Sequence, residues 1–126
     1  LAYYAYSALN IGTGPGTWEM VAGVNPENID QTISLITDEV RRFTSEPVTE
    51  EELEDTQSFY LGRLPFLLES NNGVAASLIN IERFNLGLDY FRKYPQLIES
   101  VTKIDVLEAS RKYLNANRLA IAVAGP

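Results

Sequence analysis

The sequence contains no histidine and no cysteine. Without them there is no imidazole base, no thiolate nucleophile, and no nitrogen or sulfur ligand for a metal ion. The lack of cysteine also rules out disulfide bonds and leaves the redox compartment open. A hydrolase built on this chain alone would lack the groups that most hydrolytic sites use.

Basic charge is also scarce, with 10 Lys and Arg residues against 17 Asp and Glu residues and a net charge of −7. Nucleic-acid binding needs clustered basic residues, so we expect no nucleic-acid partner. No apolar run approaches the roughly 18 residues that a membrane-spanning helix requires, and no signal peptide is visible. These absences leave the compartment open and favour a soluble, cytoplasmic protein without a membrane partner.

The 126 residues are enough for one compact domain, which we predict over residues 1–126. The chain opens on Leu1 rather than on Met and enters an apolar, aromatic segment at once. We therefore interpret it as a piece of a longer protein and as a truncated domain.

Three segments have the pattern of β-strands. Residues 1–9 are rich in Tyr and Ala, and residues 17–24 alternate between apolar and polar positions. The glycines and proline of residues 10–16 predict a turn between them, so the pair is expected to form a hairpin. Residues 118–124 are apolar and predict a buried final strand.

The middle of the chain predicts helices. Asn25 is expected to cap a helix that runs to about Thr44 and carries one apolar stripe, and Thr49 opens a capping box before a second helix. The second helix is expected to continue through about Gly62. The remaining helical segments are expected from about Pro65 to Asn85 with a break near Asn72 and Gly73, from Tyr94 to Ser100, and from Thr102 to about Leu114. Thr102 and Asp105 have the spacing of a second capping box at the start of the last segment. This order predicts an α+β fold, a mainly antiparallel sheet with helices packed on one face.

Two motifs that invite a ligand have simpler explanations. The glycines of residues 12–16 suggest a phosphate-binding loop, but that loop should open a helix, and here it opens a strand. The acidic residues of 50–55 suggest a calcium site, but their spacing is not that of a calcium loop. We interpret the first as a turn and the second as a solvated first helical turn.

Arg83 and Tyr90 are the candidate site residues. If Gly87 ends the preceding helix, Arg83 lies in its penultimate turn and Tyr90 in the following loop, where the two side chains could converge. Arg offers a fork of donors for peptide carbonyls or a carboxylate, and Tyr offers one O–H donor for an oxyanion. Alternatively, Arg83 is a surface cation at a helix end and Tyr90 a packed aromatic side chain.

Several short segments of the sequence together resemble one family, and they are spread along essentially the whole chain. The family is that of the pitrilysin, insulinase and mitochondrial-processing-peptidase metallopeptidases, the inverzincins, and the chain looks like the non-zinc C-terminal domain of a bacterial member. The segments that carry the resemblance are Leu1-Ala2-Tyr3 through Ser7, Gly16-Thr17-Trp18, Asn25-Pro26-Glu27-Asn28, Leu64-Pro65-Phe66 with Glu69-Ser70, and Glu82-Arg83-Phe84 through Leu88-Asp89-Tyr90.

The resemblance implies that two homologous halves of the enzyme have different roles. One half carries an inverted zinc motif, H-x-x-E-H, in which zinc activates water. The other half supplies an Arg and a Tyr across a chamber. By this match Arg83 would bind the substrate backbone, and Tyr90 would act catalytically by stabilising the tetrahedral intermediate. No cofactor is expected in this chain, because the zinc would belong to the partner domain or subunit.

The resemblance also sets the expected partners. These are the zinc-bearing half or a paired homologous subunit, and a peptide substrate. Without its partner the chain is expected to be inactive, which leaves open whether it counts as an enzyme. An exposed sheet edge would favour self-association. The alternative function within the family is that of a non-catalytic structural or assembly subunit.

Overall fold

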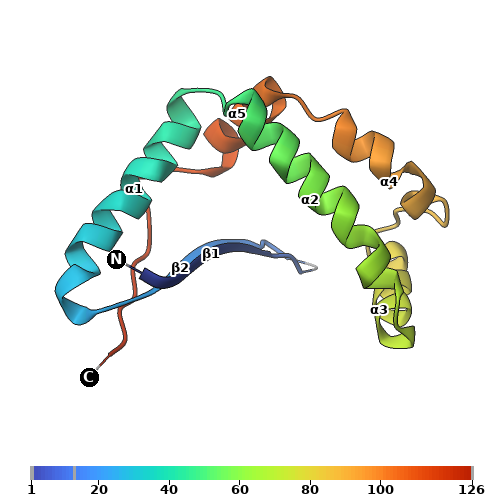
Figure 1. Ribbon diagram of the computed structural model, residues 1–126, viewed down its shortest axis with the longest axis horizontal. Coiled ribbons are helices and arrows are strands. Elements are labelled where there is room, and N and C mark those ends of the chain that lie inside the picture. Colours follow the sequence, from blue (N-terminus) through green and yellow to red (C-terminus); the bar gives the residue numbers. More distant parts are fainter. Residues whose placement is uncertain (1, 13, 126) are drawn as a thin grey trace. The chain divides into compact units, whose positions relative to one another are not determined.

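The computed structural model describes residues 2–12 and 14–125 of the chain, so the predicted strand start at Leu1 lies outside the described residues. The chain forms two compact units, one of residues 1–46 and 110–126 and the other of residues 47–109. Figure 1 shows a two-stranded antiparallel sheet and a series of helices. The α+β class predicted from the sequence is confirmed, and the packing of the helices on one sheet face stays a prediction.

No helix among the described residues is long and apolar enough to cross a membrane.

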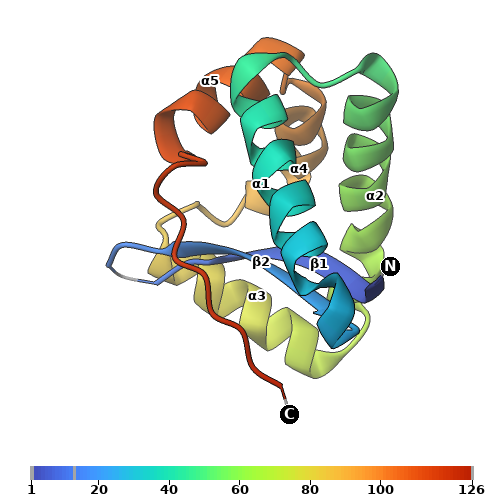
Figure 2. The same ribbon diagram turned by 90° about the vertical axis from the view of Figure 1, so that its left-hand side faces the viewer.

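The first unit contains the predicted hairpin. Strand β1 (Ala2–Asn10) pairs with strand β2 (Thr17–Val24) in antiparallel register, with Leu9 opposite Trp18 (Figure 2). At the turn, a Cβ on Gly16 would lie 2.5 Å from the Asn10 carbonyl oxygen, so this position needs glycine. The two strand predictions are confirmed.

The first helix begins where the sequence predicts but not by the expected cap. A short 3₁₀ turn, η1 (Pro26–Asn28), leads into helix α1 (Ile29–Ser45). The Asn25 side chain makes no capping bond, because its carboxamide oxygen accepts a hydrogen bond from the Tyr3 hydroxyl at 2.5 Å. The Asn25 backbone carbonyl closes the turn instead and accepts from the Asn28 N–H at 2.9 Å. Val40, at 2% exposure, is the most buried residue of the apolar stripe along α1.

The other end of α1 is closed by a residue from far along the chain. The Arg111 guanidinium donates hydrogen bonds to the carbonyls of Thr44 at 3.0 Å and Ser45 at 3.1 Å. These carbonyls belong to the last helical turn, where no intrahelical N–H is left to pair with them. This contact joins the C-terminal segment of the first unit to α1.

The predicted final strand over residues 118–124 is wrong. This segment is not assigned to a strand, and Ile121 and Val123 are each 59% exposed. The sequence pattern reports a side-chain preference, whereas a strand also needs a neighbour that completes its hydrogen bonds. Within the described residues only β1 and β2 pair with each other.

In the second unit, helix α2 (Glu50–Leu68) begins with the predicted capping box. The Glu52 N–H donates to the Thr49 hydroxyl oxygen at 3.1 Å, and the Thr49 N–H donates to the Glu52 carboxylate at 2.8 Å. The predicted end near Gly62 is wrong, because the helix continues through Pro65. A half-buried stripe runs along the helix past both positions, and its packing compensates for the hydrogen bond that proline cannot donate. The residues of the stripe are Leu53, Gln57, Leu61, Leu64 and Leu68.

The break predicted near Asn72 and Gly73 lies three residues earlier, at Glu69 and Ser70. Helix α3 (Asn71–Arg83) follows, and the Ser70 hydroxyl oxygen caps it by accepting from the Gly73 N–H at 3.0 Å. A Cβ on Gly73 would lie 2.0 Å from the Leu67 carbonyl oxygen, so the chain can only turn this tightly with glycine there.

Two further helices follow, and the division between the two units falls within the second of them. Helix α4 (Tyr90–Glu99) begins four residues before the predicted start at Tyr94 and holds Pro95 in its interior. Helix α5 (Lys103–Tyr113) begins with the predicted box, in which the Asp105 N–H donates to the Thr102 hydroxyl oxygen at 3.2 Å. The Gln57 side-chain amide of α2 donates to the carbonyl of Ile98 at 3.0 Å, which joins α2 to the end of α4.

Candidate functional site

The candidate site lies at the connection between α3 and α4, and its first feature is the end of α3. The Leu86 N–H donates to the Ile81 carbonyl at 3.0 Å, and the Asn85 N–H donates to the Glu82 carbonyl at 3.2 Å. This pair of bonds is the Schellman arrangement, which needs one residue in the left-handed conformation. Asn85 supplies it with φ of 51°.

The predicted role of Gly87 as the helix-ending residue is therefore wrong. Asn85 ends α3, since asparagine tolerates positive φ better than other non-glycine residues. Gly87, with φ of 86°, makes a second left-handed turn two residues later. As a result Arg83 is the last residue of α3 rather than a member of its penultimate turn, and Tyr90 is the first residue of α4 rather than a loop residue.

Arg83 is exposed at the C-terminal end of α3. Its guanidinium carbon lies 5.5 Å from the centre of the Phe84 ring. Within residues 2–12 and 14–125 no carboxylate pairs with it, although the unit around it is acidic. An exposed guanidinium without a carboxylate partner keeps its donors available for a ligand.

Tyr90 is half-buried at the first turn of α4. Its N–H donates to the Gly87 carbonyl at 3.1 Å. Its ring meets those of Phe91 and Tyr94 edge to face, with centroids 5.5 Å and 5.7 Å away. These contacts fix the direction of the ring. They also show that Tyr90 takes part in packing, the alternative that the sequence left open.

The electrostatics of the connection are dominated by Asp89. Its carboxylate lies 2.6 Å from the Lys93 ammonium, and this hydrogen bond lowers the pKa of Asp89 below its ordinary value. The pKa of Tyr94 is raised, first because burial disfavours the charged phenolate and then because Tyr90 and Tyr60 lie near it. Asp89 is therefore a carboxylate and Tyr94 a neutral phenol at neutral pH.

The structure places Arg83 and Tyr90 at the two ends of one short connection. Among the described residues, no hydrogen bond or ring contact joins these two side chains. An open hollow lined by Leu88, Asp89 and Arg92 lies next to Tyr90. The arrangement can present one cation and one phenol to a ligand from outside, and nothing in it supplies a base or a nucleophile.

The residues of this chain do not fit a zinc ion. In residues 2–12 and 14–125 no group of three or more acidic side chains is placed to hold a metal, and the sequence has no His or Cys. Zinc sites in proteins are built mainly from histidine nitrogen and cysteine sulfur.

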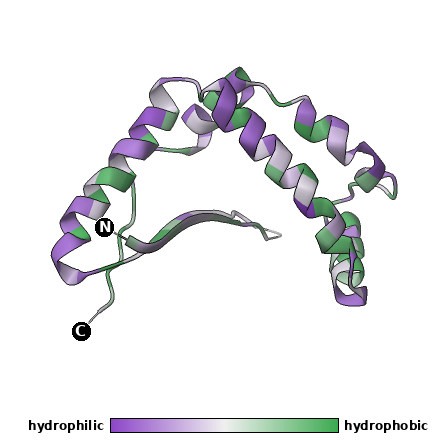
Figure 3. Ribbon diagram, in the orientation of Figure 1, coloured by the Kyte–Doolittle hydropathy of each residue, from purple (hydrophilic) through white to green (hydrophobic). Residues whose placement is uncertain are grey.

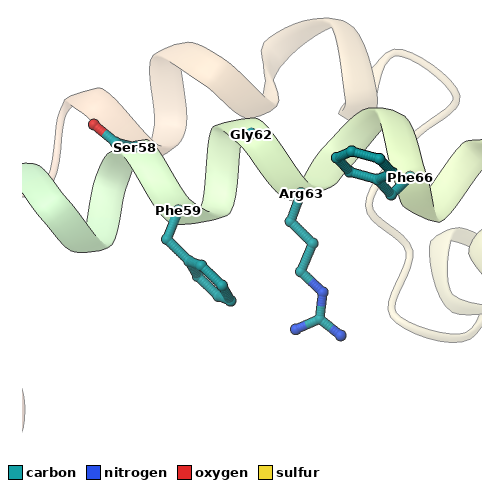
Figure 4. Close-up of a pocket in the computed structure, with 5 residues that line it drawn as sticks. All are labelled: Ser58, Phe59, Gly62, Arg63 and Phe66. Atoms are coloured by element: carbon teal, nitrogen blue, oxygen red, sulfur yellow. The ribbon is translucent and has the colours of Figure 1, made fainter.

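The structure shows a second surface that the sequence did not predict. On α2 an open hollow is lined by Ser58, Phe59, Gly62, Arg63 and Phe66, shown in Figure 4. The spacing of three and four residues between Phe59, Arg63 and Phe66 is the signal that could have found it, because such residues share one face of a helix. The prediction that the helix ended near Gly62 hid this pattern.

Comparison with protein families gives one match. The model of a family described as the Peptidase M16 inactive domain matches residues 1–60. The match covers the hairpin, α1 and the first part of α2, and it ends before Arg83 and Tyr90. No match was found among curated proteins.

Proposed function

We propose that this chain, which matches the model of the Peptidase M16 inactive domain over residues 1–60, is the substrate-binding, non-metal half of a zinc-dependent endopeptidase. The family match carries this proposal, because an inactive domain of a peptidase family is the non-catalytic half of such an enzyme. The zinc belongs in the partner half, and residues 1–126 act as one domain beside it.

In this proposal Arg83 binds the peptide. Its exposed guanidinium has no carboxylate partner among the described residues, so a peptide carbonyl or carboxylate would not have to displace one. The same charge at the end of α3 interacts favourably with the helix dipole, which holds the side chain near this terminus without blocking its donors.

Tyr90 donates a hydrogen bond to the substrate. The rings of Phe91 and Tyr94 hold its own ring in one direction, so the hydroxyl is positioned before the peptide arrives. A donor that is fixed in advance stabilises negative charge on a carbonyl oxygen without reorganisation.

The test is Tyr90→Phe in the complex assembled with the zinc-bearing half. Removing one oxyanion donor is expected to lower kcat by about 10²–10³ while the complex still forms. Tyr113→Phe is the matched control, because Tyr113 is 73% exposed and lies in the other unit. If peptide hydrolysis by the Tyr90 variant equals that of the control, the role assigned to Tyr90 is wrong.

A structural or assembly subunit is the second candidate function, and three observations favour it. The family is described as inactive, and the match ends before Arg83 and Tyr90. Tyr90 is also engaged in ring packing. In this case Tyr90→Phe would leave hydrolysis by the complex unchanged, and omitting the chain would prevent assembly of the zinc-bearing half.

The hairpin offers a surface for partners in either role. β1 pairs only with β2 among the described residues, so its outer edge carries backbone groups free to pair with another strand. The exposed side chains along it include Tyr3 and Leu9, at 77% and 64% exposure. We therefore keep self-association through this edge as part of the proposal.

A further inference from the structure

Helix α2 has a second face, opposite the stripe that packs within its unit. Its residues recur at steps of three and four and are exposed along the helix. We name this the outer α2 face and define it by Glu52, Asp55, Phe59, Gly62, Arg63 and Phe66. The half-buried stripe that begins at Leu53 lies about half a turn away around the same helix.

The centre of the outer α2 face is aromatic and open. Phe59 and Phe66 are 60% and 74% exposed, so two large apolar rings on one helix face lie open to water. Between them a Cβ built on Gly62 would meet nothing within 4 Å. Figure 4 shows Phe59 and Arg63 extending from the same side of the helix. A second helix could approach closely at this glycine and cover both rings.

The face also carries a matched pair of charges. The guanidinium carbon of Arg63 lies 5.9 Å from the centre of the Phe59 ring. Neither Arg63 nor Asp55 has an ion-pair partner in residues 2–12 and 14–125. Arg63 follows Phe59 by four residues and Asp55 precedes it by four, so they lie on either side of this ring at equal distances of about 6 Å along the helix axis.

We propose that the outer α2 face binds the outer α2 face of a second copy of this chain, with the two helices antiparallel. A two-fold axis at Phe59 brings Arg63 of each copy against Asp55 of the other, and each pair is repeated by symmetry. Rings and guanidinium groups at the centre are then covered together.

The charges select the second copy and the antiparallel direction. A parallel pair would place Arg63 against Arg63 and Asp55 against Asp55, which is repulsive. Figure 3 shows that α2 is hydrophilic in its first turns and more hydrophobic in its second half. An antiparallel pair therefore brings the acidic half of one copy onto the half that carries Arg63 in the other.

The expected dimer is weak. A single pair of helices buries an area at the low end of specific interfaces, below about 1,200 Å². The pairing is independent of the Arg83 and Tyr90 roles, because neither residue belongs to the outer α2 face. The pairing also differs from association through the β1 edge. Every chain in the experiment therefore carries Ser7→Lys, which places a charge on β1 and disfavours association there, so that the two surfaces are tested separately.

The experiment is a charge exchange followed by sedimentation over a concentration series, with Ser7→Lys as the background. The parent chain is expected to dimerise, whereas Arg63→Asp alone and Asp55→Arg alone are expected to be monomers. A mixture of the two variants is expected to form a heterodimer, because both of its contacts then join opposite charges. Arg118→Asp is the matched control for the change in net charge and should dimerise like the parent.

Three results would overturn the proposal. The first is a parent chain that stays monomeric throughout the series. The second is a mixture of the two variants that stays monomeric while circular dichroism shows the parent's helix content. The third is a Phe59→Ser variant whose monomer unfolds at a lower temperature but which dimerises like the parent. Such a result would mean that the Phe59 ring is covered within one chain. A chain whose self-association is lost through Ser7→Lys alone gives the first of these results, because its association then runs through the β1 edge and not through α2.

Discussion

The two units end their helices in different ways. In the first unit both ends of α1 involve residues far away in the sequence, since Tyr3 engages Asn25 and Arg111 binds the carbonyls of Thr44 and Ser45. In the second unit most boundaries are closed by near neighbours, as in the bond between Ser70 and Gly73. The end of α4 is the exception, because the Gln57 side-chain amide of α2 donates to the Ile98 carbonyl. A boundary closed by neighbours can form before the fold is complete, whereas the Thr44 and Ser45 carbonyls of α1 gain the Arg111 donors only when the C-terminal segment arrives.

The difference matters for function because the candidate site depends on local geometry alone. Asn85 and its neighbours turn the chain between α3 and α4 by hydrogen bonds that span no more than five residues. The positions of Arg83 and Tyr90 are therefore set within the second unit. The family match, by contrast, rests mainly on the first unit.

The largest expected effect is at the junction of α2 and α3. Gly73→Ala places a Cβ 2.0 Å from the Leu67 carbonyl oxygen, so the backbone must shift. We expect the free energy of unfolding to fall by about 1–3 kcal/mol, as for other overpacking substitutions. Chemical denaturation of the dilute chain measures this.

Gly62→Ala is the matched control, because it has open space around the new Cβ and lies inside α2. Alanine is favoured over glycine in a helix interior by about 1 kcal/mol, so this variant should be more stable than the parent. Equal effects of the two substitutions would contradict the close approach at Gly73.

The next effect concerns the end of α1. Arg111→Ala leaves the Thr44 and Ser45 carbonyls without their donors, at an expected cost of about 1 kcal/mol because the site is exposed. Amide hydrogen exchange should then be faster in the last turn of α1 and unchanged at the start of α2. Lys112→Ala is the control for loss of one positive charge. If both variants exchange alike, the contact does not hold this helix end.

The sequence predicted the features that depend on near neighbours. The capping boxes at Thr49 and Thr102 were predicted because their residue types and spacing are contained in four positions. The hairpin was predicted because its turn and the two strands are contiguous. The apolar stripe along α1 followed from helical periodicity.

The errors came from competition between a local signal and its surroundings. Gly62 and Pro65 are helix breakers by propensity, yet the packed stripe of α2 carries the helix past both. Gly87 competed with Asn85 for the end of α3, and Asn85 is the residue that follows the last turn directly. At the candidate site the sequence predicted which residues to consider, but not that Tyr90 would pack against Tyr94, which requires the register of α4.

The smallest expected effect is the pH dependence of stability at the start of α5, which separates the contribution of a charged cap from that of a neutral one. The pKa of Asp105 is lowered because its carboxylate accepts hydrogen bonds from the Thr102 hydroxyl at 2.6 Å and the Thr102 N–H at 2.8 Å. A carboxyl group with a lowered pKa in the folded state adds stability above its unfolded pKa, and this stability is lost as the pH falls through the folded value. Thr102→Val removes the hydroxyl and should therefore be less stable than the parent at neutral pH, with the difference shrinking in acid.

The control for this effect is Thr56→Val in α2. The Thr56 hydroxyl donates to the Glu52 backbone carbonyl at 2.8 Å, a group that does not titrate. Its effect on the unfolding temperature should be the same at neutral and acid pH. A difference between Thr102→Val and the parent that stays constant across the acid range would mean that the Asp105 charge adds nothing to the start of α5. The cap would then act only through the neutral hydroxyl, as the Ser70 cap of α3 does.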